Sequence, residues 1–311
     1  MHIKILGSAG DGGFPQWNCR CPNCSALRSG QLRGKARRQT QITFSPMTDV
    51  WFLFGASPDL RSQILTMPGL SPRGEGPGQS PIAGVFLSSA EVDAAMGLLH
   101  LREFQNFFVF ATPAVQRILK NENRMFKELE RSDPPVHWQA LAERRRVGCH
   151  LSENPGDAPT FFYTAVPLGG DFPDYASEEI RRSGPADEAN VGFLIEQGSK
   201  KFFFAPKISG HHSAWSKIVA SADVALIDGT FWSDDELLAT GRTKKTAREL
   251  GHLPLSGADG LLAQFPPQAR GRKILIHMNN TNPILDESSA EHRAAAEAGF
   301  EIAYDGMEIE L

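Results

Sequence analysis

The stretch Ile274-Leu275-Ile276-His277-Met278-Asn279-Asn280-Thr281-Asn282-Pro283-Ile284-Leu285 begins as a short apolar strand and becomes polar at His277. Its three apolar residues are too hydrophobic for a strand with one face in water, so they predict a strand inside a layered structure. A polar residue that ends such a strand lies at the sheet edge where layered α/β folds form binding sites. The stretch therefore predicts a buried sheet with a site at its edge.

Seven other segments resemble this strand, because each is short and strongly apolar. They are residues 50–54, 82–87, 107–110, 161–166, 191–195, 202–204 and 224–227. Helical patterns lie between several of them, at residues 59–67, 92–102, 113–120, 214–221 and 256–265. Since strands and helices alternate, a layered α/β sandwich is favoured over an all-α or all-β fold. Without repeats or a low-complexity linker, we expect one domain over residues 1–311.

Polar side chains follow several of these strands. They are Glu91 and Asp93 after the segment that ends at Leu87, Asp228 after residues 224–227, His277, and His252 before the last expected helix. Taken singly, each has a plainer explanation, since Asp93 suits the first turn of a helix and Asp228 suits a turn. Taken together, imidazoles and carboxylates are the ligands of zinc, manganese and non-haem iron. We therefore predict a metal site at this edge.

Three of the four cysteines fall within six residues, at Cys19, Cys21 and Cys24. Thiolates at this spacing can converge on one soft cation, whereas disulfides use cysteines in pairs. Zinc is favoured, and unliganded thiols or an iron–sulfur ligand set are the alternatives. A tetrahedral zinc site needs a fourth ligand, which would fix this loop to a distant segment. The candidates are Cys149, His150, His2 and a residue near His277.

The composition narrows the class of protein. With 311 residues, 41% of them hydrophobic, the chain can bury a large core, and its net charge of −4 argues against a nucleic-acid partner. The short basic run Arg33, Lys35, Arg37 and Arg38 is expected to be solvated. No apolar run approaches the roughly 20 residues that cross a bilayer, and the start does not look like a signal peptide. With clustered thiols we expect a cytoplasmic protein, whose oligomeric state, including a homodimer, stays open.

Further motifs occur in order over nearly the whole chain. They are residues 14–24, Gly55-Ala56-Ser57-Pro58-Asp59-Leu60-Arg61, Gly97-Leu98-Leu99 with Leu101-Arg102-Glu103, Asp228-Gly229-Thr230, the stretch 276–285, and Tyr304-Asp305-Gly306-Met307. Together they resemble the pyrroloquinoline quinone biosynthesis protein B family. The resemblance implies a metallo-β-lactamase fold, an αββα sandwich, in agreement with the pattern of strands and helices.

The resemblance also shows where this chain departs from its relatives. The first metal motif of metallo-β-lactamases, His-x-His-x-Asp-His, falls here on Ser89, Glu91, Asp93 and Ala94. Only the aspartate matches, and Ala94 also departs from the Asp-His pair that the resembled family usually keeps. A two-metal hydrolase is therefore not expected.

Other positions match the resembled families more closely. The resemblance makes Asp228 the bridging aspartate, His277 the last histidine and His252 an acid or base. It also puts Asn280 where phosphodiesterase relatives have the histidine that completes a structural zinc site.

Two functions follow from the resemblance. The first is iron-dependent hydroxylation of the tyrosine-derived ring of a glutamate–tyrosine precursor, with Fe(II) held by an open set of imidazoles and carboxylates. Its catalytic and metal-binding residues would be Asp93, Asp228, His252 and His277, with Glu91 in place of the missing histidine. Arg37 and Arg61 could pair with substrate carboxylates, although solvated arginines are the plainer interpretation. The alternative is a non-catalytic, transport-associated carrier of the quinone or its precursor, with a site disabled by Ala94.

Overall fold

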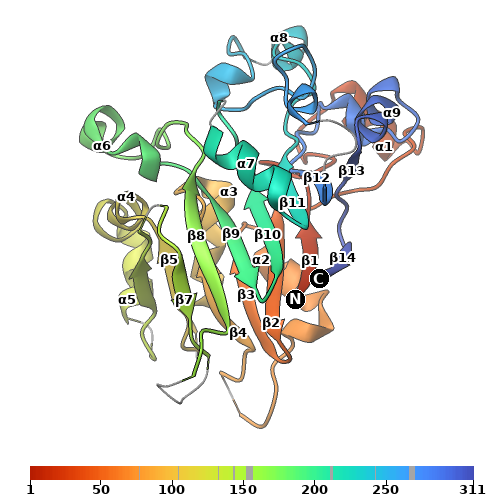
Figure 1. Cartoon of the computed structure of the whole chain (residues 1–311). Coiled ribbons are helices and arrows are strands. Elements are labelled where there is room, and N and C mark those ends of the chain that lie inside the picture. Colours follow the sequence, from red (N-terminus) through yellow and green to blue (C-terminus); the bar gives the residue numbers. More distant parts are fainter. Residues whose placement is uncertain are drawn as a thin grey trace.

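A computed structural model describes the chain except for residues 77, 104, 132, 143, 152–156, 211–212, 242 and 266–269. Two seven-stranded sheets pack face to face, and helices lie on the outside of the pair (Figure 1). The strand orders are β14-β1-β2-β3-β4-β5-β6 and β13-β12-β11-β10-β9-β8-β7. The predicted αββα sandwich is therefore confirmed.

The first sheet combines a parallel and an antiparallel part. Its strands are β1 (His2–Gly7), β2 (Gln41–Met47), β3 (Val50–Phe54), β4 (Ile82–Phe86), β5 (Phe108–Ala111), β6 (His137–Ala140) and β14 (Glu308–Glu310). Strands β3 to β6 run parallel, whereas β14, β1, β2 and β3 pair in antiparallel fashion. The chain ends meet in this sheet, because Met1 and Leu311 exchange backbone hydrogen bonds.

The second sheet has the same mixed design. Its strands are β7 (Val147–Cys149), β8 (Phe161–Pro167), β9 (Val191–Gln197), β10 (Lys200–Ala205), β11 (Val224–Asp228), β12 (Arg272–Ile276) and β13 (Phe300–Ile302). Strands β10 to β13 run parallel, while β7 to β10 pair in antiparallel fashion. The loops that leave β10, β11 and β12 therefore emerge at one edge of the sheet.

The helices are short. The α-helices are α1 (Pro22–Arg28), α2 (Leu60–Leu65), α3 (Val92–Ala95), α4 (Pro113–Gln116), α5 (Glu128–Arg131), α6 (Glu178–Ser183), α7 (Ser213–Ser221), α8 (Glu236–Ala239) and α9 (Ala290–Glu297). The other helical turns are η1 (Pro68–Leu70), η2 (Met96–Leu101), η3 (Arg117–Glu122), η4 (Arg124–Lys127), η5 (Ala186–Glu188), η6 (Arg248–Leu250), η7 (Leu262–Gln264) and η8 (Pro283–Leu285). Among the described residues, no helix combines the length and hydrophobicity needed to cross a membrane.

The expected helix at 256–265 is wrong, because only the turn η7 forms within it. Gly257 takes the left-handed conformation, with φ of 96°, which interrupts a helix at its start. The backbone N–H of Leu255 bonds to Phe231 and that of Leu261 to Pro254. These bonds fold the segment against the loop after β11.

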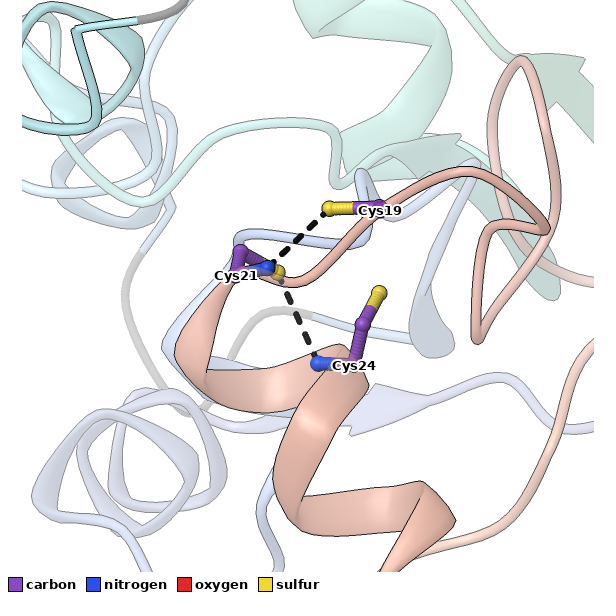
Figure 2. Close-up of side chains that lie close together, drawn as sticks. All are labelled: Cys19, Cys21 and Cys24. Carbon is purple, nitrogen blue, oxygen red and sulfur yellow. Dashed lines mark hydrogen bonds between the residues drawn. The ribbon is translucent and has the colours of Figure 1, made fainter.

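The loop after β1 carries the three clustered cysteines into α1. The backbone N–H groups of Cys21 and Cys24 point toward the sulfurs of Cys19 and Cys21, at 3.3 and 3.5 Å (Figure 2). The loop is joined to the far end of the chain by backbone bonds, including Gly10 N–H to Met278 O at 2.9 Å. This arrangement puts the cysteines beside the segment that follows His277.

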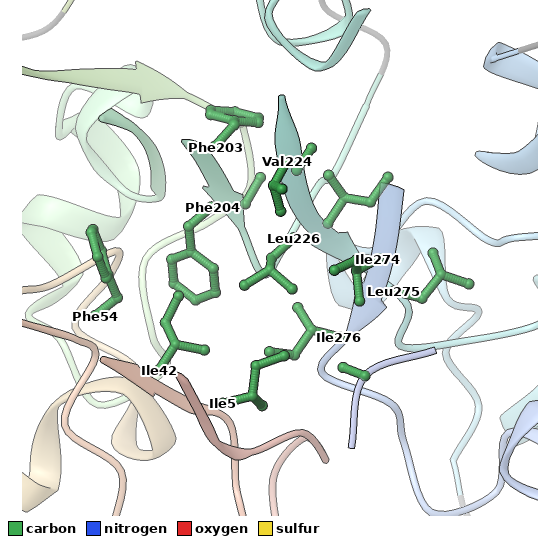
Figure 3. Packing of buried hydrophobic residues seen from close by; sticks show 14 of the residues in the cluster. Ile5, Ile42, Phe54, Phe203, Phe204, Val224, Leu226, Ile274, Leu275 and Ile276 are labelled. Carbon is green, nitrogen blue, oxygen red and sulfur yellow. The ribbon is translucent and has the colours of Figure 1, made fainter. Parts of the chain in front are cut away.

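Apolar side chains fill the space between the sheets. Figure 3 shows Ile42 and Phe54 of the first sheet close to Phe204 and Leu226 of the second. The rings of Phe54 and Phe204 lie 5.6 Å apart, and both side chains are buried. Each buried phenylalanine contributes about 1.5–3 kcal/mol. This packing holds the two sheets, and with them the strand ends, in a fixed relation.

Candidate metal centres

The loops after β1, β4, β10, β11 and β12 enclose a cavity of about 270 Å³. Two isolated backbone bridges fasten its walls, one between Ala9 and Met278 and one between Ser89 and Asn190. The cavity is lined by Glu91, Asp93, Ala94, His252 and His277, among others. Strand ends far apart in the sequence therefore meet as predicted.

Asp228 lies fully buried at the end of β11, and both of its oxygens are hydrogen-bonded. Oδ1 accepts from the backbone N–H and the hydroxyl of Thr230, at 3.0 and 2.7 Å. Oδ2 accepts from the backbone N–H of Ile208 and lies 2.8 Å from His252 Nδ1. The contact gives the proton to His252 Nδ1 and leaves the Nε2 lone pair available to a metal or a proton.

His277 lies between two polar partners. Its Nε2 is 3.0 Å from Asp93 Oδ2, and its Nδ1 is 2.9 Å from Thr230 Oγ1. Its backbone is in the left-handed region, with φ of 66°, which is uncommon for a residue with a side chain. Such conformations are found at functional sites, where the surrounding contacts impose them.

The carboxylates of Asp93 and Asp228 and the imidazole of His277 shift one another's pKa values toward the charged forms. Burial would raise the pKa of Asp93, but the hydrogen bond and charge of His277 hold it below its usual range. Burial would also raise the pKa of Asp228, but the hydrogen bond and charge of His252 and the charge of His277 hold it below its usual range. Burial would lower the pKa of His277, but Asp93 and Asp228 raise it. The carboxylates of Asp228, which is buried, and of Asp93, which is partly buried, thus remain ionised and attract positive charge.

The donor set fits one metal ion. Asp228, His252 and His277 each offer a ligand atom within 4.8 Å of the others, and Asp93 is hydrogen-bonded to His277. Two imidazoles with two carboxylates suit a divalent transition metal. We call Asp93, Asp228, His252 and His277 the rim group.

Glu91 and Ala94 also lie on the cavity wall but outside the rim group. The methyl of Ala94 offers no ligand atom. Glu91 Oε1 lies 3.5 Å from Lys207 Nζ, and burial raises the pKa of Glu91 despite this neighbour. Glu91 as the substitute for the missing histidine stays a prediction. Our sequence reasoning missed Lys207, although it follows β10 just as the predicted residues follow their strands.

The three cysteines form a second group, closed off by Asn280. The side-chain amide nitrogen of Asn280 lies 3.1, 3.4 and 3.3 Å from the sulfurs of Cys19, Cys21 and Cys24. Ligand atoms around a tetrahedral zinc ion, with Zn–S about 2.3 Å and Zn–O about 2.0 Å, lie roughly 3.5 Å apart. An amide flip, which exchanges the nitrogen for the oxygen, would turn Asn280 into a ligand. We call these four residues the cysteine centre.

The other candidates for the fourth ligand lie elsewhere. Cys149 is in β7, at the edge of the second sheet, and His150 follows it. His2 is in β1, where its ring packs edge-on against Trp51 at 5.3 Å. Burial raises the pKa of Cys21 to about 11, with its neighbours Cys19 and Cys24 adding to the rise. A thiolate in this centre therefore needs a cation beside it.

Arg37 and Arg61 do not line the cavity. The expectation that Arg37 is solvated is wrong, because it is buried, and its Nη1 donates to Ser8 Oγ and to the carbonyl of Ala303. Arg37 thereby fastens the N-terminal loop to the C-terminal segment. Arg61 is exposed on α2.

Known proteins resemble this chain over its whole length. A beta-lactamase superfamily domain matches residues 50–278. Coenzyme PQQ synthesis protein B of Pseudomonas protegens is 38% identical over 313 residues, covering 100% of both chains. That of Azotobacter vinelandii is 39% identical with the same coverage. The chain belongs to the coenzyme PQQ synthesis protein B family.

Solved structures agree with the family assignment. The crystal structure of zinc-bound PqqB from Methylobacterium extorquens has a TM-score of 0.89 at 36% identity and covers 100% of both chains. A diphosphatase from the PhnP family has a TM-score of 0.66 at 15% identity, over 100% of this chain and 97% of the other. At that identity the likeness to the diphosphatase shows a shared fold alone. The predicted family and fold are both confirmed.

Proposed function

We propose that the protein acts in PQQ synthesis as a hydroxylase that uses one redox-active metal ion, Fe(II), at the rim group. The observation that carries the proposal is the pairing of Asp93 with His277 and of Asp228 with His252. Asp93, His252 and His277 line one cavity, and Asp228 lies buried behind His252. Imidazole and carboxylate ligands with open positions are the donor set of Fe(II) oxygenases. Membership of the PQQ synthesis protein B family supports the same pathway.

The residues of the rim group share two tasks in this proposal, metal binding and proton transfer. Asp93 and His277 would hold the metal, and Thr230 fixes the His277 ring through Nδ1. Asp228 orients His252, whose Nε2 can hold the metal or accept a proton from a ring hydroxyl of the substrate. When bound, the metal supplies dioxygen activation. The substrate would be a tyrosine-derived ring of a peptide-derived quinone precursor.

The cysteine centre would hold zinc and serve the fold. The Methylobacterium relative is described as zinc-bound, and three sulfurs with one amide oxygen suit a closed, four-coordinate zinc ion. Zinc at this place would join the loop of residues 19–24 to Asn280, three residues after His277. In this way it would support the rim group without taking part in the chemistry.

Labelled dioxygen tests the hydroxylase directly. The protein is reconstituted with Fe(II) without air and then given the tyrosine-derived precursor, ¹⁸O₂ and a reductant. We expect product that has gained one ¹⁸O atom, and we expect the Asp93→Asn variant to form none.

One observation favours the carrier alternative, namely the absence of an imidazole at Ala94. A carrier would bind the same precursor, with its mass unchanged, whether or not iron is present. If the iron-loaded protein binds the precursor without converting it, the hydroxylase proposal is rejected and the carrier proposal is supported.

A further inference from the structure

Lys207 places a positive charge on the wall of the cavity, near the rim group. It follows β10 by two residues, and only 19% of its side chain is exposed. Among the described residues that line the cavity it is the one lysine or arginine. Its contact with Glu91, at 3.5 Å, is at the limit of a hydrogen bond. Since an ammonium group has three donors, this one long contact within the described part of the chain leaves donors for a ligand.

The position of Lys207 is determined by its neighbours. Its carbonyl accepts a hydrogen bond of 2.9 Å from the side-chain amide of Asn190, which also donates to Gly169 O at 3.1 Å. Asn190 is buried, so this backbone anchor is protected from water. Beside the side chain lies Gly251, where a Cβ atom would come within 3.0 Å of Lys207 Cε. The fold thus leaves room for the lysine stem and directs its ammonium group to the cavity.

The remaining charges of the cavity are mostly negative. Asp11, Glu91 and Asp93 line it, and Asp228 lies beside His252. These carboxylates repel an anionic ligand, and Lys207 would offset that repulsion in addition to any metal bound at the rim group. Apolar surface comes from Phe54, Phe204 and Phe231, with Leu237 and Leu250. The cavity therefore suits a ligand with an apolar ring and one anionic end.

We propose that Lys207 binds the carboxylate of an aromatic ligand and so positions its ring beside the rim group. The inference rests on the proposed function only in placing the ligand in the same cavity. Pairing with a substrate carboxylate was the less favoured interpretation of Arg37 and Arg61, and Lys207 is the basic side chain that the fold brings to the cavity instead. A charge-assisted hydrogen bond of this kind is stronger than a neutral one.

Two ligands of matched shape test this role. Binding of 3-phenylpropionate and of its neutral amide, 3-phenylpropionamide, is measured by calorimetry on the metal-loaded protein. We expect the parent protein to prefer the acid, and Lys207→Met to reduce the ratio of acid to amide affinity about tenfold. Lys207→Arg should keep most of the preference. Lys200→Met, an exposed change at the other end of β10, should match the parent protein.

The affinity of the rim group for a divalent metal separates this role from a structural one. Removing a positive charge from its neighbourhood should tighten metal binding in Lys207→Met, whereas a general loss of structure would weaken it. An unchanged acid-to-amide ratio in Lys207→Met, equal or undetectable binding of both probes by the parent, or weaker metal binding would each overturn the proposal. None of these measurements needs turnover, so the failure of the hydroxylase would be seen separately, in the ¹⁸O experiment.

Discussion

The cysteine centre and the rim group share one short segment, which supplies Asn280 to the first and His277 to the second, yet they are built in opposite ways. Three members of the cysteine centre come from six consecutive residues, and Asn280 closes it. The rim group draws one residue from each of four distant segments, and three of its members, Asp93, His252 and His277, line a cavity. Closed four-ligand sites are typical of structural metals, and sites with open positions are typical of catalytic ones. The comparison supports our proposal that the cysteine centre serves the fold and that the rim group carries the chemistry.

Loss of the cysteine centre should cost the most stability. We expect Cys24→Ser to lose the metal at this centre and to lower the free energy of unfolding by roughly 3–5 kcal/mol. The reason is that the free energy of metal binding, which stabilises the folded state, is lost with the ligand. Urea unfolding and metal analysis measure both effects. The control Cys149→Ser, at the edge of the second sheet, should change the free energy by about 1 kcal/mol or less. Equal effects of the two substitutions would contradict a metal role for the cluster.

Loss of His277 should act on chemistry more than on stability. Asparagine tolerates the left-handed backbone of this position, so His277→Asn should fold while losing the rim metal. We expect product formation to fall about 100-fold or more, which corresponds to roughly 2.7 kcal/mol. The metal of the cysteine centre should remain. The matched control is His137→Asn, which changes an exposed histidine in β6. Similar activity in the two variants would show that His277 has no role in catalysis.

Restoring the missing imidazole should strengthen the rim group. Ala94 lines the cavity beside Asp93, so Ala94→His adds a ligand to the set. We expect metal binding at the rim to tighten about tenfold, or roughly 1.4 kcal/mol. Titration with a divalent ion, compared with Ala95→Ser at the neighbouring buried position, measures the gain. Weaker or unchanged affinity would show that Ala94 does not limit the site.

The pH should affect the rim group in a defined direction. A metal must displace the proton of His277, and Asp93 and Asp228 raise the pKa of this imidazole. Metal affinity at the rim should therefore fall as the pH decreases, with a midpoint above the ordinary histidine value of about 6.5. Binding isotherms between pH 5 and 9 give the midpoint. A midpoint below the ordinary value would mean that the carboxylates do not act on His277 as the structure indicates.

Much of the sandwich could be predicted, because continuous apolar runs such as residues 224–227 identify buried strands directly. Strands with mixed residues, such as β2 (Gln41–Met47), and three-residue strands such as β13 (Phe300–Ile302) carry no such pattern. Asp228 and His277 were found because each directly ends an apolar strand. Lys207 could not be predicted from the sequence, because a single lysine after a strand is usually solvated and only tertiary packing brings this one to the cavity. The contact of Asn280 with the sulfurs likewise depends on tertiary structure.

Counting the metals tests the two-centre account most directly. The parent protein, Cys24→Ser and Asp93→Asn are each loaded with Fe(II) without air, and zinc and iron are measured per chain. The account predicts one zinc and one iron ion in the parent protein, with zinc lost from Cys24→Ser and iron lost from Asp93→Asn. Zinc alone at one ion per chain, with no uptake of iron by the parent protein, would contradict it.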